Sequence, residues 1–261
     1  MRRFDGKVVV VTGAASLIGA AIALEFARRG AALALCDSDE SGLRETARQC
    51  AALGAAVSTQ AVDVASRPAV YSFADRVVAR HGRVDVVVNN AGVGVLGDRA
   101  TVSDDGLESI VDHNFWGMVH GTRAFLPALE RAGGGTVVNV SSGSGPLGLP
   151  GRTSSAATKF AVRGFTESLR VELLVSGAHT RAMCVHPGGL RTGAARRPAA
   201  HLAHTSPGRA ARRIVDGVAR HKIRLLVGPD AIATDLLQRL SPVGYQRLSV
   251  FVTRQFLRTY A

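Results

Sequence analysis

The chain has 261 residues, of which 46% are apolar and 20% are charged, and this composition excludes a disordered protein. Its formal net charge is +12, but the basic residues are scattered without interleaved aromatic residues. This pattern favours a solvated arginine-rich surface over a nucleic-acid or anionic-lipid partner. The three cysteines have no CxxC spacing and no apolar run reaches 18 residues, so we expect no disulfide framework, no zinc site and no membrane-spanning helix.

Seven short runs rich in valine, leucine and alanine recur along the chain, bounded by glycine, aspartate, asparagine or proline. They are predicted strands, at residues 7–12, 31–36, 56–62, 84–89, 136–141, 181–186 and 223–228. The first run follows the N-terminus without the apolar segment and cleavage site of a secretory signal, so we expect a cytoplasmic protein.

Longer amphipathic stretches separate these runs. They are predicted helices, at residues 17–29, 40–53, 67–81, 104–131, 155–176 and 207–220. Near-continuous apolar strands that alternate with helices are typical of a parallel sheet covered on both faces. We therefore predict an α/β fold, a doubly wound Rossmann-like parallel sheet of about seven strands with helices on both faces, whose ligands bind at the carboxyl ends of the strands.

No linker divides the chain, so we expect residues 1–261 to form one domain. The segment 188–206 is rich in glycine, alanine, arginine and proline, and it is predicted to be a mobile substrate loop. The tail 231–261 carries apolar residues at partly helical spacing, which favours packing in the core or an oligomer contact. Its arginines leave open a second interpretation, a helix that lies on a membrane surface.

The first predicted strand ends in TGAASLIG, residues 12–19, and a helix follows. A glycine-bearing turn in this place lets a phosphate approach backbone N–H groups at the helix N-terminus. Asp37 ends the second predicted strand, where a carboxylate hydrogen-bonds the ribose of an adenine dinucleotide and repels a 2′-phosphate. Because Ser16 and Ser38 supply no cation for such a phosphate, the sequence favours NAD over NADP. The alternative for Asp37 is a solvated acid beside a helix.

Five further motifs follow in order: Asp63-Val64, the NNAG sequence at residues 89–92, Asn114, Ser142 with Lys159 17 residues later, and Pro187-Gly188 with Thr192. Together with TGAASLIG, they resemble the motifs of the short-chain dehydrogenases/reductases over residues 5–228. The resemblance implies a catalytic role for Asn114, Ser142, Ser155 and Lys159, and no metal site. It implies that a nicotinamide dinucleotide contacts Thr12, Gly13, Ser16, Leu17, Ile18, Gly19, Asp37, Asp63, Val64, Asn90, Ala91, Gly92, Lys159, Pro187, Gly188 and Thr192.

The sequence departs from the family pattern at two positions. Leu17 stands at the middle glycine of TGxxxGxG, where a side chain either crowds the pyrophosphate or turns inward to the core. Ser155 stands at the tyrosine of the family's YxxxK motif, four residues before Lys159. A serine hydroxyl is a far weaker acid than a phenol, so a water held by Ser155 and Lys159, or one of the histidines His113 and His186, is a candidate substitute for proton transfer.

The resemblance implies an NAD(H)-dependent oxidoreductase that acts on a secondary alcohol or ketone through an atypical proton-transfer site. The alternative is a family member that binds the cofactor but is redox-silent or catalyses a non-redox reaction. The residues that predict a small apolar substrate are Val93, Val95, Pro146, Leu147, Leu149 and Leu190. A homodimer or homotetramer is implied by resemblance, through the long helices 104–131 and 155–176.

Overall fold

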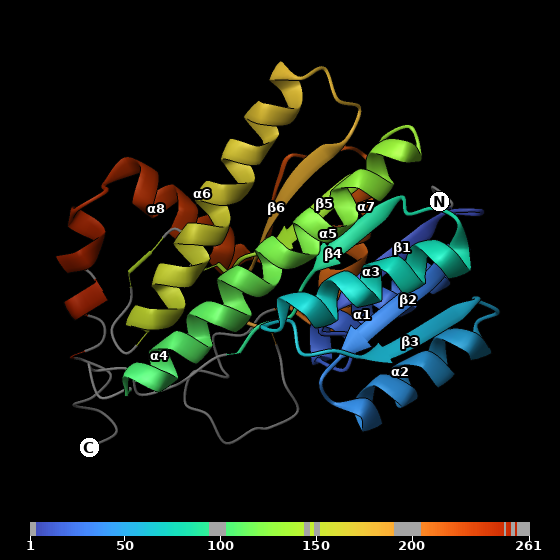
Figure 1. Ribbon diagram of the computed structural model, residues 1–261. Coiled ribbons are helices and arrows are strands. Elements are labelled where there is room, and N and C mark those ends of the chain that lie inside the picture. Colours follow the sequence, from blue (N-terminus) through green and yellow to red (C-terminus); the bar gives the residue numbers. More distant parts are fainter. Residues whose placement is uncertain are drawn as a thin grey trace.

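The computed structural model describes residues 4–93, 103–143, 147–148, 152–190, 205–247, 249–251 and 254. Its centre is a seven-stranded parallel sheet with the strand order β3-β2-β1-β4-β5-β6-β7 (Figure 1). The strands are β1 (Val8–Thr12), β2 (Ala32–Asp37), β3 (Val57–Ala61), β4 (Val86–Asn89), β5 (Thr136–Val140), β6 (Arg181–Pro187) and β7 (Arg224–Val227). The predicted fold class is confirmed, and each strand lies inside its predicted range or within one residue of it.

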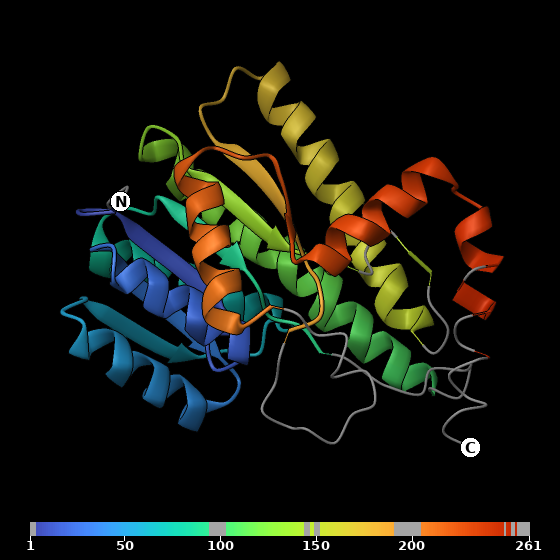
Figure 2. The ribbon, with the colours of Figure 1, turned by 180° about the vertical axis from the view of Figure 1, so that it is seen from behind.

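Helices cover both faces of the sheet, as predicted (Figures 1 and 2). The helical elements are α1 (Leu17–Ala27), α2 (Glu40–Ala52), α3 (Arg67–His81), α4 (Asp104–Val111), η1 (Asp112–Trp116), α5 (Gly117–Arg131), α6 (Thr153–Val175), α7 (Pro207–Ala219) and α8 (Pro229–Leu240). The helices α1, α2 and α7 bury one face, and α3 and α5 bury the other. Among the described residues, no helix is both long and apolar enough to cross a bilayer.

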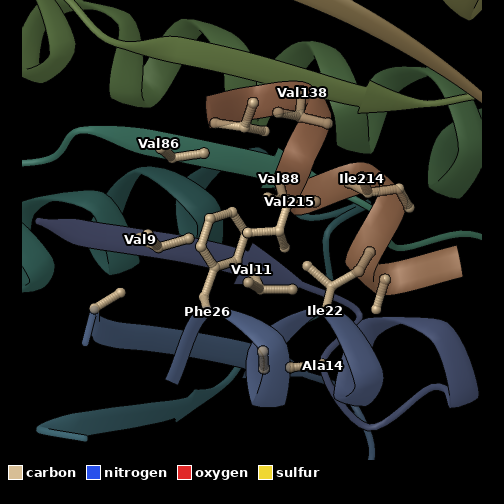
Figure 3. Packing of buried hydrophobic residues seen from close by; sticks show 14 of the residues in the cluster. Val9, Val11, Ala14, Ile22, Phe26, Val86, Val88, Val138, Ile214 and Val215 are labelled. Carbon is tan, nitrogen blue, oxygen red and sulfur yellow. The ribbon is translucent and has the colours of Figure 1, made fainter. Parts of the chain in front are cut away.

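The apolar strands are explained by this two-sided burial. Val9 and Val11 on β1 pack with Phe26 of α1 and Ile214 of α7, as Figure 3 shows, whereas Val10 points to the cluster on the opposite face. Successive side chains of a strand point to opposite faces, so a strand between two helical layers needs apolar residues at every position. The cysteines Cys36, Cys50 and Cys184 are buried, and burial raises the pKa of the Cys50 thiol to about 11.

The long helix predicted over residues 104–131 is interrupted. Residues Asp112–Trp116 form the π-helical segment η1 between α4 and α5. A π turn adds one residue to a helical turn and often occurs at functional sites. It brings the side chain of Asn114 inward, where the carboxamide bonds the backbone of Val93.

The tail predicted from residue 231 begins as α8, which starts after Gly228, and residues 244–247 and 249–251 are helical as well. Leu236, Leu240 and Phe251 are exposed, so they do not pack in the core, and the oligomer contact stays a prediction, whereas Tyr245 is buried. Because α8 and the helical residues after it extend away from the sheet, no other element covers these exposed side chains in the described part of the structure.

Candidate functional site

The loop between β1 and α1 contains glycines that leave no room for side chains. Gly13 has a φ of +67°, and a Cβ atom built on it would lie 2.7 Å from Ala91 Cα. A Cβ atom on Gly19 would lie 2.7 Å from Asn90 Nδ2 and would collide with the carbonyl oxygen of Gly13. Both glycines are therefore required where this loop meets the end of β4.

Ser16 caps the N-terminus of α1 and orients the first-turn amides. Its Oγ accepts a hydrogen bond from the Gly19 N–H at 3.2 Å and donates one to the Gly13 carbonyl at 2.6 Å. The N–H groups of Leu17 and Ile18 have no partner among the described residues, as expected for the first turn of a helix. Such a pair of free donors at a helix N-terminus is a site for an anion such as a phosphate.

The side chains of Leu17 and Ile18 do not compete for the same space. Ile18 packs against the core, so only its backbone faces the loop. Leu17 is 49% exposed, and the expectation that it turns inward as a core residue is therefore wrong. The other alternative for this position, a side chain that crowds the pyrophosphate, stays a prediction.

Thr12 and Asn90 tie the glycine-bearing loop to the end of β4. The Thr12 Oγ1 accepts hydrogen bonds from the N–H groups of Asn90 and Ala91, both at 3.1 Å. Asn90 Nδ2 lies 3.1 Å from the carbonyls of Thr12 and Gly13 and from Ser16 Oγ. These bonds join the ends of β1 and β4 into one rigid edge. They give Asn90 and Ala91 a structural role that requires no direct contact with a ligand.

A cavity of about 310 Å³ opens at this edge, between the ends of β1 to β4. The Asp37 carboxylate lines it, accepting hydrogen bonds from the N–H groups of Ala15 at 2.8 Å and Asp39 at 3.0 Å. The described lining residues are Gly13, Ala15, Ser16, Asp37, Ser38, Asp39, Val62, Asp63, Val64, Ala91, Gly92, Val93 and His113, and they contain no lysine or arginine. The cavity thus offers carboxylate acceptors for hydroxyl groups and no lysine or arginine for a phosphate.

The predicted pair Asp63-Val64 forms the far wall of this cavity. Asp63 is exposed and lies 3.2 Å from His113 Nε2, while its Oδ1 also accepts the N–H of Ala65. Val64 is buried against Gly117, whose missing Cβ would lie 2.7 Å from the valine side chain. His113 therefore contacts Asp63 and lines the Asp37 cavity, and its role as a proton donor beside Lys159 stays a prediction.

Asn114 and Lys159 meet at Gly92, the last residue of the NNAG sequence. Asn114 is buried, accepts the Val93 N–H at 2.7 Å and donates to the Val93 carbonyl at 2.9 Å. A Cβ atom on Gly92 would lie 2.7 Å from Asn114 Oδ1 and 3.5 Å from Lys159 Nζ. The absence of a side chain at Gly92 therefore leaves the lysine ammonium next to the strand-end edge.

Lys159 lies in the second turn of α6, with its ammonium in a desolvated position. Its Nζ donates a hydrogen bond to the Val140 carbonyl at 3.1 Å, and the neighbouring Ser141 hydroxyl bonds the Lys159 carbonyl at 2.9 Å. Burial lowers the pKa of Lys159 to about 8, because the described residues supply no carboxylate to stabilise the charge. The lysine is thus able to gain or lose a proton close to neutral pH.

Ser142 follows β5 and is half-buried. Behind it lies His186, whose Nδ1 is 3.1 Å from the Ser142 carbonyl. His186 is fully buried, and burial lowers its pKa to about 4, so the ring is neutral at pH 7 and donates from Nδ1. The geometry makes His186 a support for the Ser142 backbone and removes it from the candidates for proton exchange with a substrate.

Ser155 lies in the first turn of α6, one turn before Lys159 and half-buried. Its carbonyl accepts a hydrogen bond from the Thr158 hydroxyl at 3.0 Å, but its own hydroxyl has no partner within the described chain. The predicted catalytic set is therefore brought to one edge, with a short side chain in place of the expected phenol.

The turn at Pro187-Gly188 ends β6 and approaches the Ser142 loop closely. The N–H of Gly143 donates to the Pro187 carbonyl at 2.5 Å, and a Cβ atom on Gly143 would lie 3.0 Å from Gly188 Cα. Thr192 and the rest of the predicted loop through residue 204 lie outside the described residues, as do Val95, Pro146 and Leu149. Leu147 is buried, whereas Val93 is exposed.

Three residues of the C-terminal region reach this site and were missed by sequence reasoning. The Asp230 carboxylate accepts the Gly189 N–H at 2.5 Å, Thr234 Oγ1 lies 3.3 Å from the Gly143 carbonyl, and Tyr245 Oη accepts the Gly148 N–H at 3.0 Å. The only sequence signal was Asp230 directly after Gly228-Pro229, at the carboxyl end of the last strand. Thr234 and Tyr245 carry no signal, because their partners are about 90 residues or more away in the chain.

Comparison with known families and proteins agrees with this geometry. Residues 7–202 match the family model described as short chain dehydrogenase. The chain is 45% identical to a Mycobacterium tuberculosis protein named as an oxidoreductase, SadH, over 95% of both chains. It is 33% identical to human estradiol 17-beta-dehydrogenase 11, over 91% of this chain and 80% of that protein.

Solved structures show the same architecture. A short chain dehydrogenase/reductase from Burkholderia phymatum in complex with NAD superposes with a TM-score of 0.85 at 29% identity, over 92% of this chain and 95% of that one. An alcohol dehydrogenase from Thermococcus sibiricus, complexed with 5-hydroxy-NADP, superposes with a TM-score of 0.75 at 28% identity, over 85% and 94% of the two chains. Proteins with this architecture are thus solved with nicotinamide dinucleotides of both phosphorylation states.

Proposed function

The chain belongs to the short-chain dehydrogenase family of oxidoreductases, and from this premise we propose that it transfers hydride between NAD(H) and a secondary alcohol or ketone through an altered proton-transfer site. The observation that carries the proposal is the convergence of Asn114 and Lys159 on Gly92, at the strand-end edge that also holds the Asp37 cavity. Cofactor and proton-transfer residues at one edge are what a dinucleotide-linked redox site requires.

The residues at the cavity fit a nicotinamide dinucleotide. The free N–H groups of Leu17 and Ile18 suit its pyrophosphate, and the Asp37 carboxylate suits the ribose hydroxyls at the adenine end. A 2′-phosphate would meet the carboxylates of Asp37 and Asp39 with no lysine or arginine in the described lining, so we propose NAD rather than NADP. Bound there, the cofactor would supply or accept the hydride.

The remaining residues act on the substrate oxygen and its proton. We assign Ser142 to orient that oxygen, and His186 to hold the Ser142 backbone in place through its carbonyl. Lys159 binds the cofactor ribose and provides the positive charge that favours a negative oxygen nearby. Asn114 fixes the backbone of Val93. We assign it a second role, to hold a water that relays protons between Lys159 and solvent.

Ser155 defines the atypical part of the site. Its hydroxyl is too weak an acid and too short to replace a phenol, which titrates near pH 10 when unperturbed. General acid–base catalysis contributes about 10²–10⁴-fold, so the loss removes roughly 3–5.5 kcal/mol of barrier lowering. A water between Ser155 Oγ and Lys159 Nζ is the proposed proton carrier.

A second candidate function is a family member that binds the dinucleotide without turning over a redox substrate, or that catalyses a non-redox reaction. Two observations favour it: Ser155 at the phenol position, and the exposed Leu17 at the mouth of the anion site. Ser155 removes the phenol of the proton-transfer site, and both changes leave the Asp37 cavity intact.

The test is an NADH titration followed by a redox screen with secondary alcohols and ketones of increasing apolar size. We expect micromolar binding of NADH, weaker binding of NADPH and slow turnover that disappears in Lys159→Met. Tight NADH binding with no turnover across the screen would favour the second candidate. Absence of binding to either dinucleotide would contradict both.

A further inference from the structure

The segment after β7 carries a row of apolar side chains that the described structure leaves uncovered. In both views α8 and the helical residues after it lie at the opposite end of the molecule from β3 and α2 (Figures 1 and 2). Leu240 is 76% exposed, Val243 70% and Phe251 65%. We call the set the C-terminal face, and its members are Ile232, Leu236, Leu240, Val243, Val250 and Phe251.

The apolar row runs along one side of α8. Ile232, Leu236 and Leu240 are four residues apart, so they stand on one stripe of the helix. Ala231 and Asp235, on the opposite side of α8, are buried against the rest of the protein. The side of α8 that faces the protein thus includes a charged residue, Asp235. The side that faces away from the protein carries apolar residues.

The exposed charges that the described part of residues 231–261 carries have a single sign. Arg239, Arg247 and Arg254 are exposed, and Arg247 and Arg254 have no carboxylate partner among the described residues. Asp235 is the one acid between residues 231 and 261, and it is buried in ion pairs with Arg224 and Arg239. The described part of this region therefore presents cations and apolar groups without an exposed carboxylate.

This charge pattern decides which kind of partner fits. A second copy of the chain joined by a two-fold axis would place the same patch against itself, bringing arginines against arginines without acids to pair them. An anionic bilayer has the complementary chemistry, because its headgroups attract arginine and its acyl boundary accepts leucine, valine and phenylalanine. We propose that the C-terminal face binds the surface of anionic lipid membranes without spanning them.

A second exposed apolar patch provides a contrast within the same chain. Val171, Leu174 and Val175 are exposed at the C-terminal end of α6, but Glu172 is exposed among them. A carboxylate in that position is repelled by anionic headgroups. Both patches therefore expose apolar residues. Of the two, the C-terminal face is the one that adds positive charge complementary to anionic headgroups.

The C-terminal face is connected to the candidate site. Tyr245 is buried beneath it and its Oη accepts the N–H of Gly148, in the loop that follows Ser142. Membrane binding at this face would bring the loop near the bilayer, where apolar alcohols and ketones dissolve. That consequence rests on the proposed function, whereas the binding itself does not and is tested without any redox assay.

The test is sedimentation of the full chain with vesicles of mixed phosphatidylcholine and phosphatidylglycerol, compared with pure phosphatidylcholine vesicles. We expect at least about tenfold tighter binding to the anionic vesicles, and weakening as NaCl is raised. The double variant Leu240→Ser/Val243→Ser should bind at least about tenfold more weakly, because two apolar side chains no longer insert. Arg247→Gln/Arg254→Gln should bind about tenfold more weakly to anionic vesicles only.

The matched control is Leu174→Ser/Val175→Ser, which removes two equally exposed apolar side chains from α6 and should leave vesicle binding unchanged. Circular dichroism melting confirms that every variant is folded. Failure of the wild-type chain to bind anionic vesicles, or an equal loss in the α6 control, would overturn the proposal. A variant at Leu240 and Val243 that changes the mass measured by light scattering, but not vesicle binding, would show that the face joins copies of the chain.

Discussion

The carboxylate of Asp230 accepts a hydrogen bond from the backbone N–H of Gly189 at 2.5 Å, and so connects the start of α8 to the turn that ends β6. Its other oxygen is buried and has no partner among the described residues. Gly188 has no room for a side chain, because a Cβ atom would collide with the same carboxylate. The position of the turn thus depends on an acid from a distant part of the chain.

We predict that Asp230→Ala raises the Kd for NADH about tenfold, because a hydrogen bond to a charged acceptor contributes roughly 1.5–3 kcal/mol and the turn loses its anchor. Fluorescence titration of NADH measures this change. The control is Asp230→Asn, which keeps an acceptor oxygen and should recover most of the affinity. Equal losses in both variants would show that the charge, and not the position of the turn, is what matters.

The cofactor preference should depend on Asp37. In Asp37→Ala/Ser38→Arg, the repelling carboxylate is removed and a guanidinium is added at the lining of the cavity. We predict that the ratio of the Kd values moves toward NADPH by at least about tenfold. Ser38→Arg alone is the control, since it retains both the carboxylate and its bond to the Ala15 N–H. An unchanged ratio in the double variant would contradict the placement of Asp37 at the ribose.

The proton-transfer site should be restored by Ser155→Tyr. Ser142, Asn114 and Lys159 lie at one edge of the sheet, and the Ser155 hydroxyl is unbonded in the described structure. We expect at least about a tenfold gain in NAD(H)-linked turnover of a secondary alcohol or ketone, since imperfect placement forfeits only part of the acid–base contribution.

The matched control for this substitution is Ser155→Phe, which adds the same ring without the hydroxyl and should give no gain. Thermal melting shows whether either ring clashes with side chains that fill the space. A stable Ser155→Tyr protein that binds NADH without gaining activity would contradict the oxidoreductase proposal and favour the redox-silent alternative.

The pH dependence should follow Lys159, whose pKa burial lowers to about 8. Ketone reduction consumes a proton, so its rate should be highest below pH 8 and should fall as the ammonium deprotonates. The folded pKa lies below the ordinary value of 10.5, so the folded state binds fewer protons between these values and its stability should rise with pH across that window.

Rate profiles of the wild type and Lys159→Met check the first expectation, and urea melts of the same two proteins check the second. The measurements run from pH 6 to pH 11, a range that includes both the folded pKa of about 8 and the ordinary value of 10.5. The variant lacks the ammonium, so its rate profile should lose the inflection near pH 8. An inflection that persists in Lys159→Met would assign the titration to another group.

Association should use α4, α5 and α6, the helices at residues 104–131 and 155–176, as the family resemblance implies. Trp116, the last residue of η1 before α5, is 46% exposed, and Phe160 of α6 is exposed to a similar degree. We predict that the wild type is a dimer or tetramer and that Trp116→Ser/Phe160→Ser is a monomer at micromolar concentration, because two large apolar contacts are lost. Light scattering measures the mass, and Leu53→Ser, at the end of α2, is the control that should not change it.

The sequence by itself determined the sheet and the identity of its edge. Valine-rich runs between amphipathic stretches require burial on both faces, and the strands accordingly formed where they were predicted. Gly13, Gly19 and Asp37 were recognisable because their roles depend on local backbone shape and on the position of a strand end. Such features depend only on residues that are close together in the chain, so a sequence pattern reveals them.

Tertiary structure alone decided what depends on distant residues or on helical phase. The π turn at Asp112–Trp116 shifts the helix by one residue, about 100° of rotation, and so directs Asn114 to Val93 without a change in apolar periodicity. Leu17 points outward because Ile18 already fills the core position. Asp230 and Tyr245 reach loops that are 41 and 97 residues away, and such contacts arise from how the crossovers stack the elements, which the periodicity of a single segment does not encode.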